Sequence, residues 1–102
     1  MQTEEMIYVH EFCTWHQVEI SFIDSLSRSG LVEIIIHDEK KAVALHQLPQ
    51  LEKMVRLYYE MDINMEGIET ITYLLNRMNE MQREIVQLNN RLLLYENKVE
   101  EG

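Results

Sequence analysis

The residues closest to metal or thiol chemistry stand near the N-terminus, where His10, Cys13 and His16 follow one another at intervals of three. Imidazole and thiolate groups are zinc ligands, and a spacing of three places neighbouring residues near one face of a helix. The two histidines, however, lie about 120° apart around such a helix, and no fourth ligand is obvious. The pattern therefore favours a buried cysteine with two partly exposed histidines, and it implies no metal and no cofactor.

No machinery for catalysis can be assigned from the sequence. The three glycines form neither a glycine-rich phosphate loop nor a nucleophile elbow. Cys13 and His16 could act as a thiol nucleophile and its base, but a short helical region of this kind is not expected to provide a substrate cleft. We therefore expect a protein that binds another macromolecule and is not an enzyme.

Length and composition indicate one small folded domain. The chain has 102 residues, of which 46% are hydrophobic and 26% are charged, a balance typical of globular proteins. A chain of this length buries a modest share of its surface, so a partner subunit would stabilise it considerably. Cys13 is the only cysteine, and the sequence shows neither a secretion signal nor the roughly 18 consecutive apolar residues of a membrane span. We expect a soluble, cytoplasmic protein.

Residues 1–48 are predicted to form short elements. A first helix around Cys13 and a second over roughly Ile20 to Ser29, which Gly30 ends, make a helix-turn-helix unit. Two apolar runs around a charged tip then indicate a two-stranded wing. In the second helix, Ile23 and Leu26 are predicted to point inward. The predicted wing consists of strands at Leu31 to His37 and Ala42 to Leu45, joined by the tip at Asp38 to Lys41, and an edge strand is predicted at Glu4 to Tyr8.

Residues 49–102 are predicted to form a helical pair. Pro49 suits the first turn of a helix that runs to about Met61, and Asp62 to Asn64 interrupt the helical pattern. Asn64 is a good N-cap for a fourth helix that begins near Met65 and meets no later breaker. The predicted buried stripe of the third helix is Leu48, Leu51, Met54, Val55 and Tyr58.

The fourth helix carries an unbroken heptad pattern, which predicts a dimeric coiled coil with a seam roughly 43 Å long. The alternative is an amphipathic helix packed on its own domain, but a pattern this sustained exceeds the core that so short a chain can supply. No buried asparagine sets the register, so the pattern leaves the orientation of the two helices open. The seam residues are Ile71, Leu74, Met78, Met81, Ile85, Leu88, Leu92, Tyr95 and Val99.

The predicted layout is mainly α: a winged helix-turn-helix followed by a helical pair that ends in a long coiled-coil helix. It resembles the MerR family of regulators. The segment VEISFIDSLSRSGLVE, from Val18 to Glu33, is similar to that family's second helix and following strand, with matches at Ile23, Arg28, Gly30 and Leu31. Where DNA-binding members carry arginine and two tyrosines for backbone contacts, this chain has Asp24, Ser25 and Leu26.

A closer resemblance is to the CbpM-like chaperone modulators, a branch of the same fold. VHEFC, from Val9 to Cys13, resembles their opening helix, and DINMEGIETITYLLNRMNEMQREIVQLNNRL, from Asp62 to Leu92, resembles their N-x-x-G-I-E helix start and coiled coil. The resemblance implies that the chain binds and inhibits the J-domain of a DnaJ-like or CbpA-like co-chaperone. The alternative is a MerR-like transcriptional regulator that binds DNA.

The charge of the chain distinguishes between these two functions, J-domain binding and DNA binding. The net charge is −9, and residues 1–45 contain eight acidic and three basic side chains. A DNA-reading domain normally carries the opposite sign, so we expect DNA binding to be weak. The resemblance implies a basic helix on the J-domain, which an acidic surface around the second helix would attract. The predicted partner-binding residues are Glu19, Asp24 and Arg28.

Overall fold

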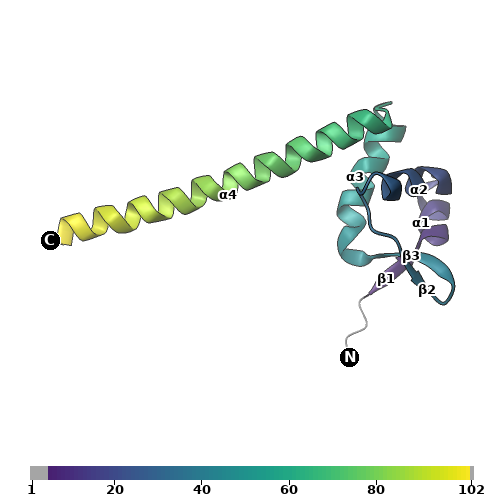
Figure 1. The fold of residues 1–102 in the computed structure, drawn as a ribbon, viewed down its shortest axis with the longest axis horizontal. Helices are drawn as coiled ribbons and strands as arrows, with labels where there is room; N and C mark the ends of the chain where they lie inside the picture. Colours follow the sequence, from purple (N-terminus) through teal and green to yellow (C-terminus); the bar gives the residue numbers. More distant parts are fainter. Residues whose placement is uncertain (1–4, 102) are drawn as a thin grey trace. The chain divides into compact units, whose positions relative to one another are not determined.

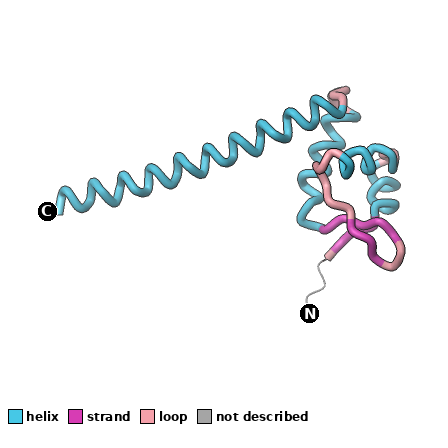
Figure 2. Tube along the Cα trace, in the orientation of Figure 1, coloured by secondary structure: helices cyan, strands magenta, loops and turns pink. Residues whose placement is uncertain are grey.

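The structure, a computed structural model, describes the backbone of residues 5–101 and the side chains of residues 5–98. The fold is mainly helical, as predicted, with a small antiparallel sheet (Figures 1 and 2). The chain divides into two compact units between Glu69 and Thr70. The boundary predicted after residue 48 falls in the first turn of a helix that begins at Leu48 and stays a prediction. Among the described residues, no helix is both long enough and apolar enough to cross a membrane.

The first two helices form the predicted helix-turn-helix. Helix α1 spans Val9–His16, and Gln17, with φ 55°, ends it in the left-handed conformation. Helix α2 spans Ile20–Arg28, and Gly30, with φ 76°, provides the turn after it. The N–H of Leu31 closes this turn by donating to the carbonyl oxygen of Leu26 at 2.9 Å. Ile23 and Leu26 are fully buried, which confirms the predicted inward face of α2.

The sheet has the order β1-β3-β2, with β1 at Met6–Tyr8, β2 at Ile35–His37 and β3 at Lys40–Ala44. Two parts of the predicted wing were wrong. Residues 31–34 form a loop before β2, because Gln47 pairs with the backbone of Glu33 through both atoms of its side-chain amide, at 2.8 and 3.0 Å. The charged tip is only Asp38 and Glu39, because Lys40 pairs with His37 in the ladder. Glu4, in the predicted edge strand, lies outside the described residues.

Helix α3 spans Leu48–Tyr59 and follows a single 3₁₀ turn at Leu45–Gln47. Leu51 and Met54 bury completely against the first two helices and the sheet. Two members of the predicted stripe differ. Leu48 is half-buried, and Tyr58, the second-last residue of α3, is 37% exposed and packs its ring in a tilted geometry against Phe22.

Helix α4 spans Met65–Glu101, and its first turn explains the N-x-x-G-I-E motif. The Asn64 side-chain oxygen accepts a hydrogen bond from the N–H of Gly67 at 2.8 Å, which confirms the predicted N-cap. A Cβ at Gly67 would lie 2.6 Å from a methyl group of Ile63, so this position has no room for a larger residue. Ile68, the next residue, is completely buried in the core.

Candidate interaction surfaces

The structure separates the three residues predicted to bind a partner. Glu19 precedes α2 and Arg28 is its last residue, so the two are about 13 Å apart along the helix axis. The Glu19 carboxylate accepts a hydrogen bond from the Ser21 hydroxyl at 3.2 Å. Arg28 donates to the hydroxyl of Ser25, also at 3.2 Å. Asp24 and Arg28 are about one helical turn apart, whereas Glu19 and Arg28 lie at opposite ends of α2, so the three charges are spread along the helix.

Asp24 is paired with the wing. The ammonium group of Lys41 in β3 lies 3.0 Å from an Asp24 carboxylate oxygen, and both side chains remain partly exposed. A pair exposed to this degree contributes little to stability, typically about 0–1 kcal/mol. It nevertheless neutralises Asp24 locally, so Glu19 is the less compensated of the two predicted carboxylates.

Lys40, the second lysine of the wing, also has a partner on the protein. The Lys40 ammonium group lies 5.4 Å from the centroid of the Tyr8 ring, a cation–π geometry. The Tyr8 hydroxyl in turn shares a hydrogen bond with Nδ1 of His37 at 3.0 Å, whose direction depends on the histidine tautomer. Both wing lysines, the cations best placed to meet a phosphate, are therefore held by partners on the protein.

The junction between α1 and α2 rests on an aromatic cluster of Phe22, Tyr58 and Tyr59. Phe22 lies 4.4 Å from Tyr58 and 5.5 Å from Tyr59 between ring centroids. The Tyr59 hydroxyl accepts a hydrogen bond from the backbone N–H of Glu19 at 3.1 Å. This contact ties the start of α2 to the end of α3 and fixes where Glu19 stands.

The histidines and cysteine near the N-terminus occupy different environments. Cys13 is buried, His10 is exposed, and the exposed His16 stacks on Phe12 with ring centroids 4.3 Å apart. Burial raises the pKa of the Cys13 thiol, and the negative charge of Asp24 raises that pKa further. Within the part of the chain that the structure describes, no group of three or more histidine, cysteine or acidic side chains is placed to hold a metal ion.

Sequence reasoning missed a groove on the outer side of α1. It has a volume of about 360 Å³ and contains Trp15, whose residue surface is 82% exposed. The sequence contained a signal for this groove in the spacing of Cys13 and Trp15. Residues two apart in a helix point about 200° away from each other, so a buried Cys13 places Trp15 on the outer side of the helix. The lining residues are Ile7, His10, Glu11, Thr14 and Trp15.

The predicted seam of α4 is apolar and open to solvent in the single chain. Ile71 is half-buried, and the side chain of Val99 lies outside the described residues. The remaining seven seam residues are between 48% and 67% exposed: Leu74, Met78, Met81, Ile85, Leu88, Leu92 and Tyr95. Such a stripe of large, exposed apolar side chains along one helix indicates an interaction surface.

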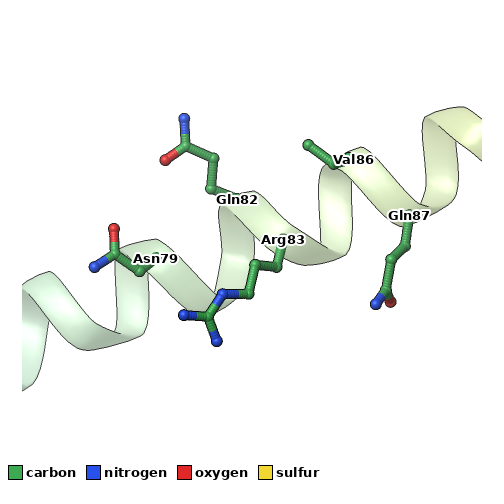
Figure 3. A pocket seen from close by; sticks show the side chains of 5 residues that line it. All are labelled: Asn79, Gln82, Arg83, Val86 and Gln87. Carbon is green, nitrogen blue, oxygen red and sulfur yellow. The ribbon is translucent and has the colours of Figure 1, made fainter.

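A shallow hollow on the same helix is not a binding cavity. Figure 3 shows that its five lining side chains project from one helix and that no second element faces them. These residues lie outside the heptad seam, so they belong to the polar side of α4. They are Asn79, Gln82, Arg83, Val86 and Gln87.

Comparison with protein families places most of the chain in one of them. Residues 7–90 match the family described as MerR HTH family regulatory protein. The match runs from β1 through the helix-turn-helix, the wing and α3 into α4. No curated protein matches the chain in sequence.

Proposed function

The chain belongs to the MerR helix-turn-helix family of regulatory proteins, and from this premise we propose that it regulates by binding protein rather than DNA. Its target is the J-domain of a DnaJ-like or CbpA-like co-chaperone, which it inhibits. The observation that carries this proposal is that both wing lysines have partners on the protein: Lys41 pairs with Asp24, and Lys40 lies over Tyr8.

The charge of the first unit supports the same target class. Residues 1–69 contain thirteen acidic and five basic side chains, a net charge of −8. A surface of this sign repels a phosphate backbone and attracts basic protein surfaces. The resemblance to CbpM-like modulators implies that the basic helix of a J-domain is such a surface. The proposed mechanism is masking: the modulator covers the helix with which the J-domain engages Hsp70.

The N-x-x-G-I-E motif adds support of a different kind. Asn64 caps α4, Gly67 leaves room for the Ile63 methyl group, and Ile68 fills the core. The motif therefore performs a structural task at the start of α4. It supports the proposal because the residues that form this helix start, Asn64, Gly67 and Ile68, are those of the motif that resembles the CbpM-like modulators.

We also propose that the chain forms a homodimer through the α4 seam and acts in the cytoplasm, where its J-domain partner would reside. Residues 70–102 carry five acidic and four basic side chains, a net charge of −1. Two copies of this segment would repel each other far less than two copies of the first unit. Replacing Ile85 and Leu88 by aspartate places unpaired charges in the seam and should convert the dimer to monomer or aggregate in light scattering. A monomeric wild-type protein at micromolar concentration would contradict the dimer.

The modulator proposal is tested with purified J-domains from the protein's own cell. We expect calorimetry to detect binding and a steady-state assay to show lower J-domain stimulation of Hsp70 ATPase activity. Glu19→Lys should slow association and remove much of its salt dependence, because peripheral charges act mainly on the association rate. Asp24→Asn should have a smaller effect, since Lys41 already neutralises Asp24. The control variant replaces Glu100 and Glu101 by lysine. Absence of heat and of any ATPase change with every J-domain tested would refute the proposal.

A further inference from the structure

The groove on α1 contains the only tryptophan of the chain. Trp15 is 82% exposed, although a tryptophan side chain is usually mostly buried. It lies in the last turn of α1, about 200° around the helix from the buried Cys13. Nothing in the core explains a large aromatic residue at this position. Tryptophan in contact surfaces, by contrast, is among the residues that contribute most to binding.

The other lining residues make the groove a shaped apolar surface. Half-buried Ile7, in β1, supplies an aliphatic wall, and Thr14 in α1 lies beside Trp15. The Thr14 hydroxyl donates to the carbonyl oxygen of His10 at 2.9 Å, so its donor is already used within the helix. What Thr14 offers a partner is therefore mainly its methyl group. The groove lies on the outside of α1, apart from the salt bridge between α2 and the wing.

Charge determines what can occupy this groove. Glu11 lines it, is exposed, and has no ion pair within the described part of the chain. The sequence contains neither lysine nor arginine before Arg28, and the two wing lysines are held by Asp24 and Tyr8. The groove itself is lined by no lysine and no arginine. Charge complementarity therefore favours an occupant that brings its own positive charge to meet Glu11.

We propose that this groove is the docking surface for a basic segment of a partner protein. An aliphatic or aromatic side chain of that segment packs on the Trp15 indole and Ile7, and a lysine or arginine pairs with Glu11. The indole face also accepts a cation directly. This inference rests on the proposed function in that the basic helix of a J-domain is the expected occupant. It adds a binding surface on α1 to the residues predicted on α2.

The single tryptophan makes the test direct, because all tryptophan fluorescence of the protein comes from Trp15. Addition of a purified J-domain should shift the emission to shorter wavelength and reduce quenching by acrylamide at least about twofold, since burial removes water and quencher. Trp15→Ala should weaken J-domain binding about tenfold or more, as is usual for a central interface tryptophan. Glu11→Lys should also weaken it.

Ile36→Ala is the matched control, because Ile36 is a large apolar residue of the same unit, 68% exposed and outside the groove. Circular dichroism and the melting temperature verify that each variant is folded. Trp15→Phe should recover part of the binding lost in Trp15→Ala. If the J-domain binds, but Trp15 emission does not change and Trp15→Ala binds as tightly as wild type, then the groove is not the docking surface. The proposal that the protein is a J-domain modulator would remain valid.

A second probe, a basic peptide, tests the docking groove independently of the proposal that the partner is a J-domain. If no J-domain gives any heat, the modulator proposal fails, and the groove is tested with a helical peptide of lysine and leucine. A blue shift with this peptide that is absent with a peptide of glutamate and leucine, and that Glu11→Lys removes, supports the groove alone. Absence of a shift with both the lysine peptide and the J-domain overturns it.

Discussion

Cys13 connects the core of the first unit to its surface charge. Burial raises the pKa of its thiol, and the Asp24 carboxylate adds to the shift. Because the folded state holds the proton more tightly than the unfolded state, this thiol's contribution to stability is full below the unfolded pKa of about 8.5. It is lost as the pH rises from there through the folded pKa. The core around α1 should therefore weaken under alkaline conditions.

We predict that the free energy of unfolding falls more between pH 7 and pH 10 in the wild-type protein than in Cys13→Ala. The extra loss can reach at most about 1.4 kcal/mol per pH unit. Urea denaturation at pH 7, 8.5 and 10 measures both proteins, and comparing them removes the contributions of tyrosines and lysines that titrate in the same range. Parallel pH profiles for the two proteins would show that the thiol does not couple to folding.

Residues with local partners were predictable, and residues with distant partners were not. Asn64 caps a group three residues away, so its role follows from the sequence pattern. The contacts between Asp24 and Lys41, and between Gln47 and Glu33, join residues 17 and 14 positions apart. Such pairs depend on how the chain turns back on itself. For the same reason the sequence indicated Asp24 as a partner-binding residue, but it did not indicate that Lys41 pairs with it.

At the scale of the element, the turn of the wing is strained. Asp38 and Glu39 have φ values of 51° and 64°, in the left-handed region that costs a residue other than glycine roughly 1–2 kcal/mol. A two-residue turn between antiparallel strands with positive φ at both positions favours glycine at the second. In this chain both turn positions are occupied by acidic residues, which directly precede Lys40 and Lys41 of β3 in the sequence.

Glu39→Gly is therefore predicted to stabilise the protein by about 0.5–1 kcal/mol, after allowing for the greater freedom of glycine in the unfolded chain. Lys40→Gly is the control: Lys40 lies in strand β3, where glycine is unfavourable, so this variant should be less stable than wild type. Thermal unfolding followed by circular dichroism compares the three proteins. A lower melting temperature for Glu39→Gly would mean that its carboxylate makes a contact stronger than the backbone strain.

Helix α4 was the element best predicted from sequence, because its heptads repeat locally and its first turn has a clear cap. The orientation of two such helices depends on the residues beside the seam. In a parallel pair in register, Arg91 faces Glu96 of the partner subunit, which is attractive. In the antiparallel pair with the longest overlap, Arg77 faces Arg91 of the partner subunit, and Glu84 faces its own copy. Both antiparallel contacts are repulsive, so we expect a parallel dimer.

Cross-linking can test this orientation in a Cys13→Ala background, where introduced cysteines are the only thiols. Leu74→Cys should form a disulfide between two identical chains, because parallel helices place the two copies of residue 74 opposite each other. In the antiparallel arrangement residue 74 instead faces residue 92, and the two copies of residue 74 lie roughly 27 Å apart. A disulfide that appears only when Leu74→Cys and Leu92→Cys proteins are mixed would contradict the parallel dimer.

At the scale of the whole molecule, charge is distributed unevenly along the chain. Residues 1–69 carry a net charge of −8, and residues 70–102 carry −1. The helix-turn-helix unit is thus the strongly acidic part of a protein whose family is regulatory. The sign of this charge was evident from the sequence, but the pairing of the wing lysines was not, because it requires the fold. Together they support the proposal that DNA is the less favourable partner for this unit.

We predict that the protein binds duplex DNA no more tightly than roughly 10⁻⁵ M at physiological salt, within the range of nonspecific binding. Fluorescence anisotropy with fragments from the protein's own genomic neighbourhood measures this affinity. Replacing Glu19 and Asp24 by arginine restores positive charge to α2 and should strengthen binding, with a salt dependence steeper by about 0.9 for each additional phosphate that the variant neutralises. The same variant should lose affinity for a J-domain, so the two ligands should respond in opposite directions. Wild-type binding near 10⁻⁸ M to a palindromic fragment, typical of specific recognition, would instead establish the transcriptional regulator.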